Sequence, residues 1–132
     1  MEIITKHAVE ILILLFLIVT FLQSGIDKLT DWKGNLSFIQ EHFKSSPLKN
    51  MVPLLLGIVL LTEIIASIFM IYGIFELISS GTKDFAVYGI QLSALTLIFL
   101  LIGQRLAKDY AGAMTLAVYF IITILGLFVL NN

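Results

Sequence analysis

Four long apolar runs constrain this chain more than any other feature of its sequence. A helix needs roughly 20 apolar residues to cross a bilayer core of ~30 Å, and residues 8–29, 51–79, 85–106 and 111–130 each meet that length. The 132-residue chain is 59% hydrophobic and 13% charged, whereas soluble domains carry about 25% charged residues. We therefore expect an all-α membrane protein that forms one domain over residues 1–132.

The composition also excludes several classes of function. A net charge of -1 argues against a nucleic-acid surface, which needs a basic patch. The chain has no cysteine, so it offers no thiol chemistry. His7 and His42 both lie outside the apolar runs, so no haem or metal site is expected. The first run is predicted to be a retained membrane anchor, because Leu22 and Ser24 make a poor signal-peptide cleavage site.

The joints between the runs predict how the spans are connected. Short joints, "SSGTKD" and "QRLAKDYAG", follow the second and third spans, and short joints make neighbouring helices antiparallel. We therefore expect an up-down bundle of four transmembrane helices.

The first joint, residues 30–50, is longer and still patterned. Leu36, Ile39 and Phe43 recur at helical spacing, which predicts a short amphipathic surface helix between the first two spans, with Trp32 as an interfacial anchor. Pro47 is expected to open the second span.

The basic residues predict an orientation. Six of them lie in or next to the first and third joints, whereas the N-terminus and the second joint carry only two. Positive-inside counting then places loops 1 and 3 in the cytoplasm and both termini outside. If Lys28 and Arg105 belong to a buried site, the difference falls to four against two. The two sets are Lys28, Lys33, Lys44, Lys49, Arg105 and Lys108 against Lys6 and Lys83.

Glu63 lies close to the middle of the second span. A charge at a helix centre costs about 2.5–3.5 kcal/mol on insertion scales, so Glu63 needs a partner or a proton. Small residues on the same side, Ala66, Ser67 and Gly73, permit close helix contact. Two interpretations stay open: a structural glutamate bonded to a neighbour, and a functional acid in the bundle interior.

Lys28 ends the first span at the side of the membrane where the second span begins. A lysine near a helix end can extend outward to the headgroups. Gly25, one turn earlier, leaves room for another backbone or a ligand, so Lys28 can instead turn inward toward Glu63, directly or through a bridging water or ligand.

The third joint, "GQRLAKDYAGA", adds a second polar cluster on the same side. It is either an ordinary interfacial turn or a place where Arg105 points inward at an anionic or carbonyl-bearing ligand. Tyr119, a mid-span phenol, needs a hydrogen-bond partner. The candidate ligand-binding residues are Lys28, Glu63, Gln104, Arg105 and Tyr119, and the candidate structural small-residue positions are Gly25, Gly73 and Gly112.

These patterns together resemble the DoxX family of small four-helix bacterial membrane proteins. Gly25, Lys28 and Leu29 resemble the end of the family's first helix, and Glu63 resembles the acid of its second. The resemblance implies the bacterial cytoplasmic (inner) membrane. It also implies a quinone-linked redox system, because relatives include a membrane subunit associated with thiosulfate:quinone oxidoreduction. Relatives often have a second glycine after the acid, so the packing can differ here.

Two classes of function follow. The first is a membrane subunit or accessory of a redox system, which holds a quinone or other lipophilic molecule among Lys28, Glu63 and Arg105 and takes electrons from a protein partner. The second is a non-enzymatic scaffold or assembly factor that binds a partner protein through the loop 30–50 helix. A transporter is disfavoured, because no pair of interrupted helices is present. Membrane lipids are expected partners, a homo-oligomer is compatible with either class, and no reaction is assigned.

Overall fold

The computed structural model describes residues 5–131, which contain helices and turns but no strands. The helices are α2 (Ala8–Thr30), α3 (Trp32–His42), α4 (Val52–Ser79), α5 (Asp84–Leu106) and α6 (Tyr110–Leu130). All but α3 are long and apolar enough to cross a membrane. The four predicted spans are therefore confirmed, and each predicted bound lies within one residue of the observed one.

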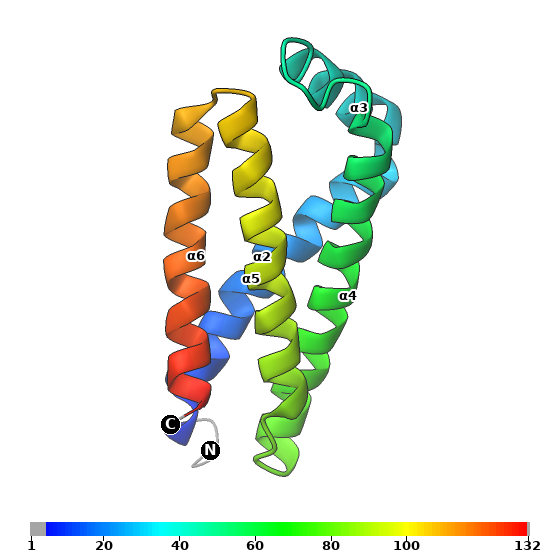
Figure 1. The fold of residues 1–132 in the computed structure, drawn as a ribbon. Helices are drawn as coiled ribbons and strands as arrows, with labels where there is room; N and C mark the ends of the chain where they lie inside the picture. Colours follow the sequence, from blue (N-terminus) through cyan, green and yellow to red (C-terminus); the bar gives the residue numbers. More distant parts are fainter. Residues whose placement is uncertain (1–4, 132) are drawn as a thin grey trace.

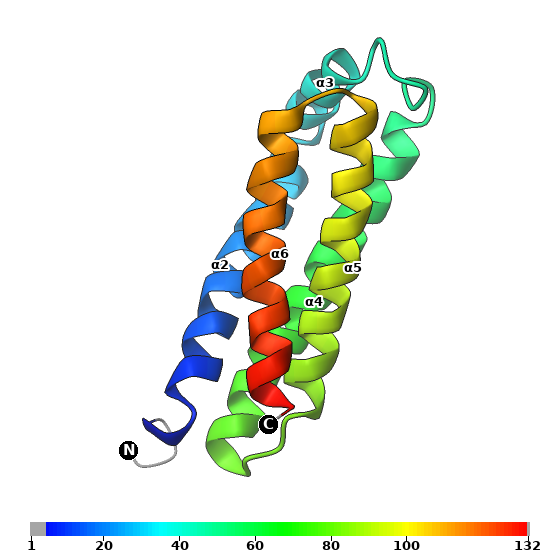
Figure 2. The same cartoon turned by 60° about the vertical axis from the view of Figure 1, so that its left-hand side comes forward.

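The four long helices run up and down in turn. Figure 1 shows α6, α5 and α4 side by side, with α2 crossing behind them at an angle. Both termini and the α4–α5 turn lie at one end of the bundle, which we call the termini end. Helix α3 and the α5–α6 turn lie at the opposite end, the α3 end (Figure 2).

Glycines set how closely the helices approach. At Gly73 on α4, an added Cβ would lie 2.6 Å from the Cα of Ala86 on α5, so the two backbones are in contact there. Helix α2 changes neighbour along its length. An added Cβ at Gly126 of α6 would lie 2.9 Å from Ile13 of α2, and one at Gly25 of α2 would lie 2.8 Å from Ile64 of α4. The crossing of α2 follows from these two contacts.

The well-packed core belongs mainly to the termini end. It includes Phe21 of α2, Met70 of α4 and Ile90 of α5, all almost fully buried. On α4 the members of this core begin at Ala66, just after Glu63. Toward the α3 end, α4 instead faces a cavity. Glu63 therefore marks the boundary between a close-packed half and a hollow half of the bundle.

The predicted surface helix exists, but it begins earlier than residue 36. Helix α3 starts at Trp32 because Asp31 caps it, accepting a hydrogen bond from the backbone N–H of Gly34 at 3.2 Å. The side chain of Asn35 donates to the carbonyl oxygens of Asp27 (3.1 Å) and Asp31 (2.8 Å). These bonds fix the angle between α2 and α3. Within α3 no residue is buried, so the helix lies on the end of the bundle.

The predicted role of Pro47 is wrong. Residues 43–51 form turns, and α4 begins at Val52 with Pro53 in its first turn. A proline is favourable in a first helical turn because its missing N–H would have no partner there. Pro53 takes this role, and Pro47 lies in a turn in which the hydroxyl of Ser46 accepts a hydrogen bond from the backbone N–H of Leu48.

Candidate functional site

A cavity of about 460 Å³ lies at the α3 end. Its walls are mostly apolar, and α3 with the turn after it covers one side. Helix α2 contributes Ser24 and Lys28; α3 and the following turn contribute Phe38, Ile39, His42, Phe43 and Leu48; α4 contributes Val52, Leu55, Leu56, Val59 and Glu63; α5 contributes Phe99, Leu100, Ile102, Gly103 and Gln104; the start of α6 contributes Asp109 and Leu116.

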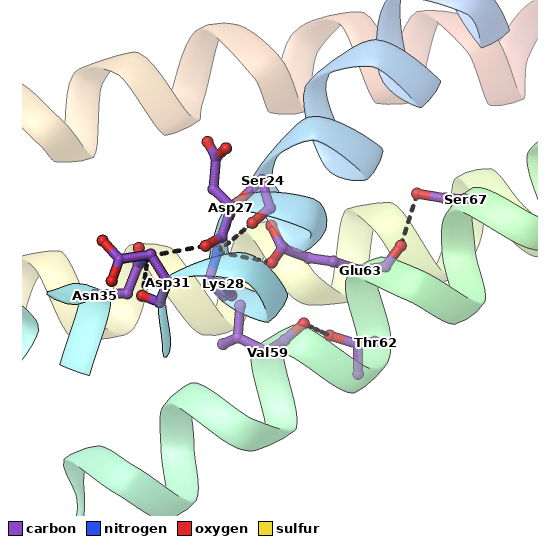
Figure 3. Close-up of polar contacts among 9 residues, drawn as sticks. All are labelled: Ser24, Asp27, Lys28, Asp31, Asn35, Val59, Thr62, Glu63 and Ser67. Carbon is purple, nitrogen blue, oxygen red and sulfur yellow. Dashed lines mark hydrogen bonds and ion pairs between the residues drawn. The ribbon is translucent and has the colours of Figure 1, made fainter. Parts of the chain in front are cut away.

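Lys28 and Glu63 form an ion pair on the wall of this cavity. The ammonium nitrogen of Lys28 lies 2.9 Å from Oε1 of Glu63, and the two side chains are 13% and 4% exposed. Figure 3 shows Lys28 reaching from α2 toward the carboxylate on α4. Lys28 also donates a 2.6 Å hydrogen bond to the hydroxyl of Ser24. Lys28 therefore points into the bundle, and its contact with Glu63 is direct.

The sequence places these groups together by helical spacing and close approach. Ser24 and Lys28 are four residues apart and so share one face of α2. Gly25, between them, lets α2 come close to Ile64, the neighbour of Glu63 in the chain. A bulkier residue at Gly25 would push the helices apart at the level of the pair.

The carboxylate of Glu63 keeps an unused hydrogen-bonding position. The 2.9 Å contact with Lys28 has the distance of an ion pair but not the angles of a hydrogen bond. Among the described residues, Oε1 of Glu63 is the buried side-chain oxygen that lacks a hydrogen-bond partner. The hydroxyl of Ser67, one turn along, donates to the backbone carbonyl of Glu63 at 2.7 Å and so does not serve the carboxylate (Figure 3).

A second polar cluster lines the more exposed part of the cavity. Nε2 of His42 on α3 lies 2.8 Å from Oε1 of Gln104 on α5 and 3.5 Å from Oδ2 of Asp109. Asp109 also caps α6, accepting from the N–H of Gly112 at 2.9 Å. Lys108 precedes it with φ 61°, the left-handed conformation that often ends a helix. This cluster ties α3 to the α5–α6 turn.

The candidate residues from the sequence divide into two groups. Lys28, Glu63 and Gln104 line the cavity. Arg105 is exposed, with its guanidinium 5.2 Å from the ring centre of Tyr110, and it does not line the cavity. Tyr119 is half-buried beside Phe16, with ring centres 6.2 Å apart, and it also lies outside the cavity lining.

The glycine positions are packing positions. Besides the contacts of Gly25 and Gly73, an added Cβ at Gly112 would lie 2.6 Å from Oδ2 of Asp109 and 2.6 Å from Nε2 of Gln104. A side chain at Gly112 would therefore displace the polar groups that line the cavity.

Two polar residues of the cavity, His42 and Ser24, belong to none of the polar clusters predicted from the sequence. His42 follows Phe38 by four residues and Ile39 by three, so the spacing that predicted the surface helix also puts His42 on its cavity side. Ser24 precedes Lys28 by one turn, and the sequence shows it only as part of a poor cleavage site. In both cases helical spacing was the available signal, and it needed the position of α3 or α4 to become informative.

Comparison with known proteins identifies the family of this chain. No curated protein and no solved structure matches the chain. The model of the DoxX family matches residues 11–107, which is more than half of the chain. The matched region includes Ser24, Lys28, Glu63 and Gln104. With four apolar helices long enough to span a membrane, this multi-pass membrane protein belongs to the DoxX family.

Proposed function

We propose that this protein holds a lipophilic molecule with a polar head, such as a quinone, as a membrane subunit or accessory of a redox system in the bacterial inner membrane. One observation carries the proposal. A buried ion pair, Lys28 with Glu63, lines an otherwise apolar cavity of about 460 Å³. That volume falls within the range of about 300–1,000 Å³ typical of small-molecule sites, which combine apolar walls with a few polar groups.

The energetics of the pair support a binding role. Burying two charges costs several kcal/mol per ion, and apolar residues of similar size would often be as stable. A purely structural pair would best be enclosed by packed side chains. Here the close-packed core begins beyond Glu63, and the pair faces a cavity instead. Ionisable groups inside a membrane domain are by default candidates for function.

A quinone-like head fits the available groups. The ammonium of Lys28 can donate to a ring oxygen, and the apolar side chains of α4 and α5 can pack against a ring and its tail. The chain has no cysteine to ligate a cluster. In this account the protein binds and positions the lipophilic molecule, and a partner protein supplies or removes the electrons.

The orientation proposal rests on the exposed cations. Lys28 is engaged in the ion pair, so it does not count as a topology marker. Arg105 is exposed and does count. The α3 end then carries five basic residues against two at the termini end, which favours a cytoplasmic α3 end. The five are Lys33, Lys44, Lys49, Arg105 and Lys108.

Mass spectrometry of small molecules retained by the gently purified protein tests the proposal. The wild type is compared with Glu63→Gln and with Glu76→Gln, a glutamate on the same helix outside the cavity. We expect wild type and Glu76→Gln to retain the same quinone or lipid and Glu63→Gln to lose it while staying folded. Equal retention by all three proteins would count against the site.

A second candidate, a scaffold that docks a partner protein through α3, is favoured by one observation. Phe38 of α3 is 69% exposed. In that case Phe38→Ser should abolish co-purification of a partner, whereas Phe75→Ser, at a comparably exposed phenylalanine on α4 (66%), should not. Equal co-purification by both variants would exclude docking through α3.

A further inference from the structure

We infer that the site selects the hydroxyl-bearing form of its ligand, a phenol or quinol, over the corresponding carbonyl or ether form. This inference rests on the proposed function and names the chemistry of the bound head group. It follows from which hydrogen-bonding positions around Glu63 are occupied and which are not.

Among the described residues, Lys28 is the one donor group shown next to the buried oxygen of Glu63, and their 2.9 Å contact lacks the angles of a hydrogen bond. Oε1 of Glu63 has no hydrogen-bond partner, and because the side chain is only 4% exposed, bulk water does not supply one. The neighbouring hydroxyls are directed elsewhere: Thr62 donates to the carbonyl of Val59 at 2.9 Å, and Ser67 donates to the carbonyl of Glu63 itself. An unmet buried acceptor is destabilising, and more so when it is charged. The site therefore calls for a donor from the cavity.

Lys28 and Glu63 together present a donor beside an acceptor. The ammonium of Lys28 donates to the hydroxyl of Ser24 at 2.6 Å and, over a longer 3.4 Å, to its backbone carbonyl. An ammonium has three N–H groups, so one remains to donate to a ligand beside Glu63. A hydroxyl group matches this arrangement, since its O–H can donate to Glu63 while its oxygen accepts from Lys28. A carbonyl or ether oxygen can only accept, and its lone pairs would face the carboxylate.

This selectivity has a consequence for a redox pair. If a quinone and its quinol both enter the cavity, the site stabilises the quinol more. Tighter binding of the reduced form raises the reduction potential of the bound pair. The bound quinone then becomes a stronger electron acceptor than the quinone free in the membrane, which suits a site that receives electrons from a partner protein.

A pair of redox-inert probes tests the inference. We would measure binding of para-octylphenol and of its methyl ether, para-octylanisole, to the protein in lipid nanodiscs by equilibrium dialysis, relative to empty nanodiscs. A hydrogen bond to a charged group contributes about 1.5–3 kcal/mol, so the wild type should bind the phenol at least about tenfold more tightly than the ether. Glu63→Gln, confirmed as folded by circular dichroism, should reduce this preference to a few-fold, and Glu76→Gln should leave it unchanged.

The outcomes separate the inference from the proposed function. Equal binding of phenol and ether by the wild type would mean that a water molecule meets the demand of Glu63, and it would overturn the inference while leaving the proposed site intact. An unchanged preference in Glu63→Gln would overturn it as well, because the selectivity would then arise elsewhere. Binding of neither probe above the level of empty nanodiscs would overturn both the inference and the proposed function.

Discussion

Replacing Lys28 with methionine removes the cation that balances Glu63, and we expect this change to destabilise the bundle by about 3–5 kcal/mol. Removing one member of a buried ion pair typically costs about 3–5 kcal/mol, and this pair is 13% and 4% exposed. The hydrogen bond from Lys28 to Ser24 is lost too, but Ser24 is only half-buried.

The double variant Lys28→Met with Glu63→Met should recover most of this loss, since an apolar replacement of both partners is often neutral or stabilising. The free energy of unfolding is measured by titration with sodium dodecyl sulfate in mixed micelles. Lys33→Met, at an exposed lysine of α3, serves as the control and should stay within about 0.5 kcal/mol of the wild type. A loss below about 1 kcal/mol in Lys28→Met would refute the reasoning, because it would place Lys28 at the headgroups rather than on Glu63.

Three further changes are expected to have distinct effects. Gly73→Ala should lose about 1–3 kcal/mol in the same unfolding assay, because its Cβ would overlap the α5 backbone. Gly57→Ala should instead gain up to about 1 kcal/mol, because nothing lies within 4 Å of its Cβ. Equal effects of the two variants would contradict the close contact of α4 and α5. Asp109→Ala should lower the free energy of unfolding by about 1 kcal/mol and speed hydrogen exchange in the first turn of α6, whereas Asp109→Asn should keep the cap. Unchanged exchange in the alanine variant would exclude the capping role. Arg105→Ala and Tyr119→Phe should leave retention of the small molecule unchanged, since both residues lie outside the cavity lining; a loss in either would mean that the ligand extends beyond the cavity.

The spans were predictable from the sequence because hydrophobic length alone decides them. The start of α3 was not. Asp31 is the single residue between α2 and α3, and neither glycine nor proline marks the break. Its capping of Trp32–His42 depends on a bend of the chain that the local composition does not indicate. Pro47 and Pro53 both lie where a helix could begin, but Pro47 lies in the turns before α4 and Pro53 lies in the first turn of the helix.

The candidate site was predictable only in part, for a similar reason. Lys28 and Glu63 are charged residues within apolar spans, so both could be identified as candidates from the sequence. The distance between them depends on the approach of α2 to α4 at Gly25, which residue spacing within one helix does not define. Arg105 appeared equivalent to Gln104 in the sequence, yet one residue along a helix turns a side chain by about a quarter of a turn, from the cavity to the surface.

Photo-crosslinking with a short-chain azidoquinone in proteoliposomes, followed by mass spectrometry of the labelled peptides, tests the central claim most directly. If the cavity is the site, the label will fall on residues 52–63 of α4 and 99–104 of α5, and excess unlabelled quinone will remove it. Label confined to exposed apolar positions such as Leu12 and Ile121, and unaffected by competition, would show that the quinone merely dissolves in the surrounding lipid, and the cavity would lose its assigned role.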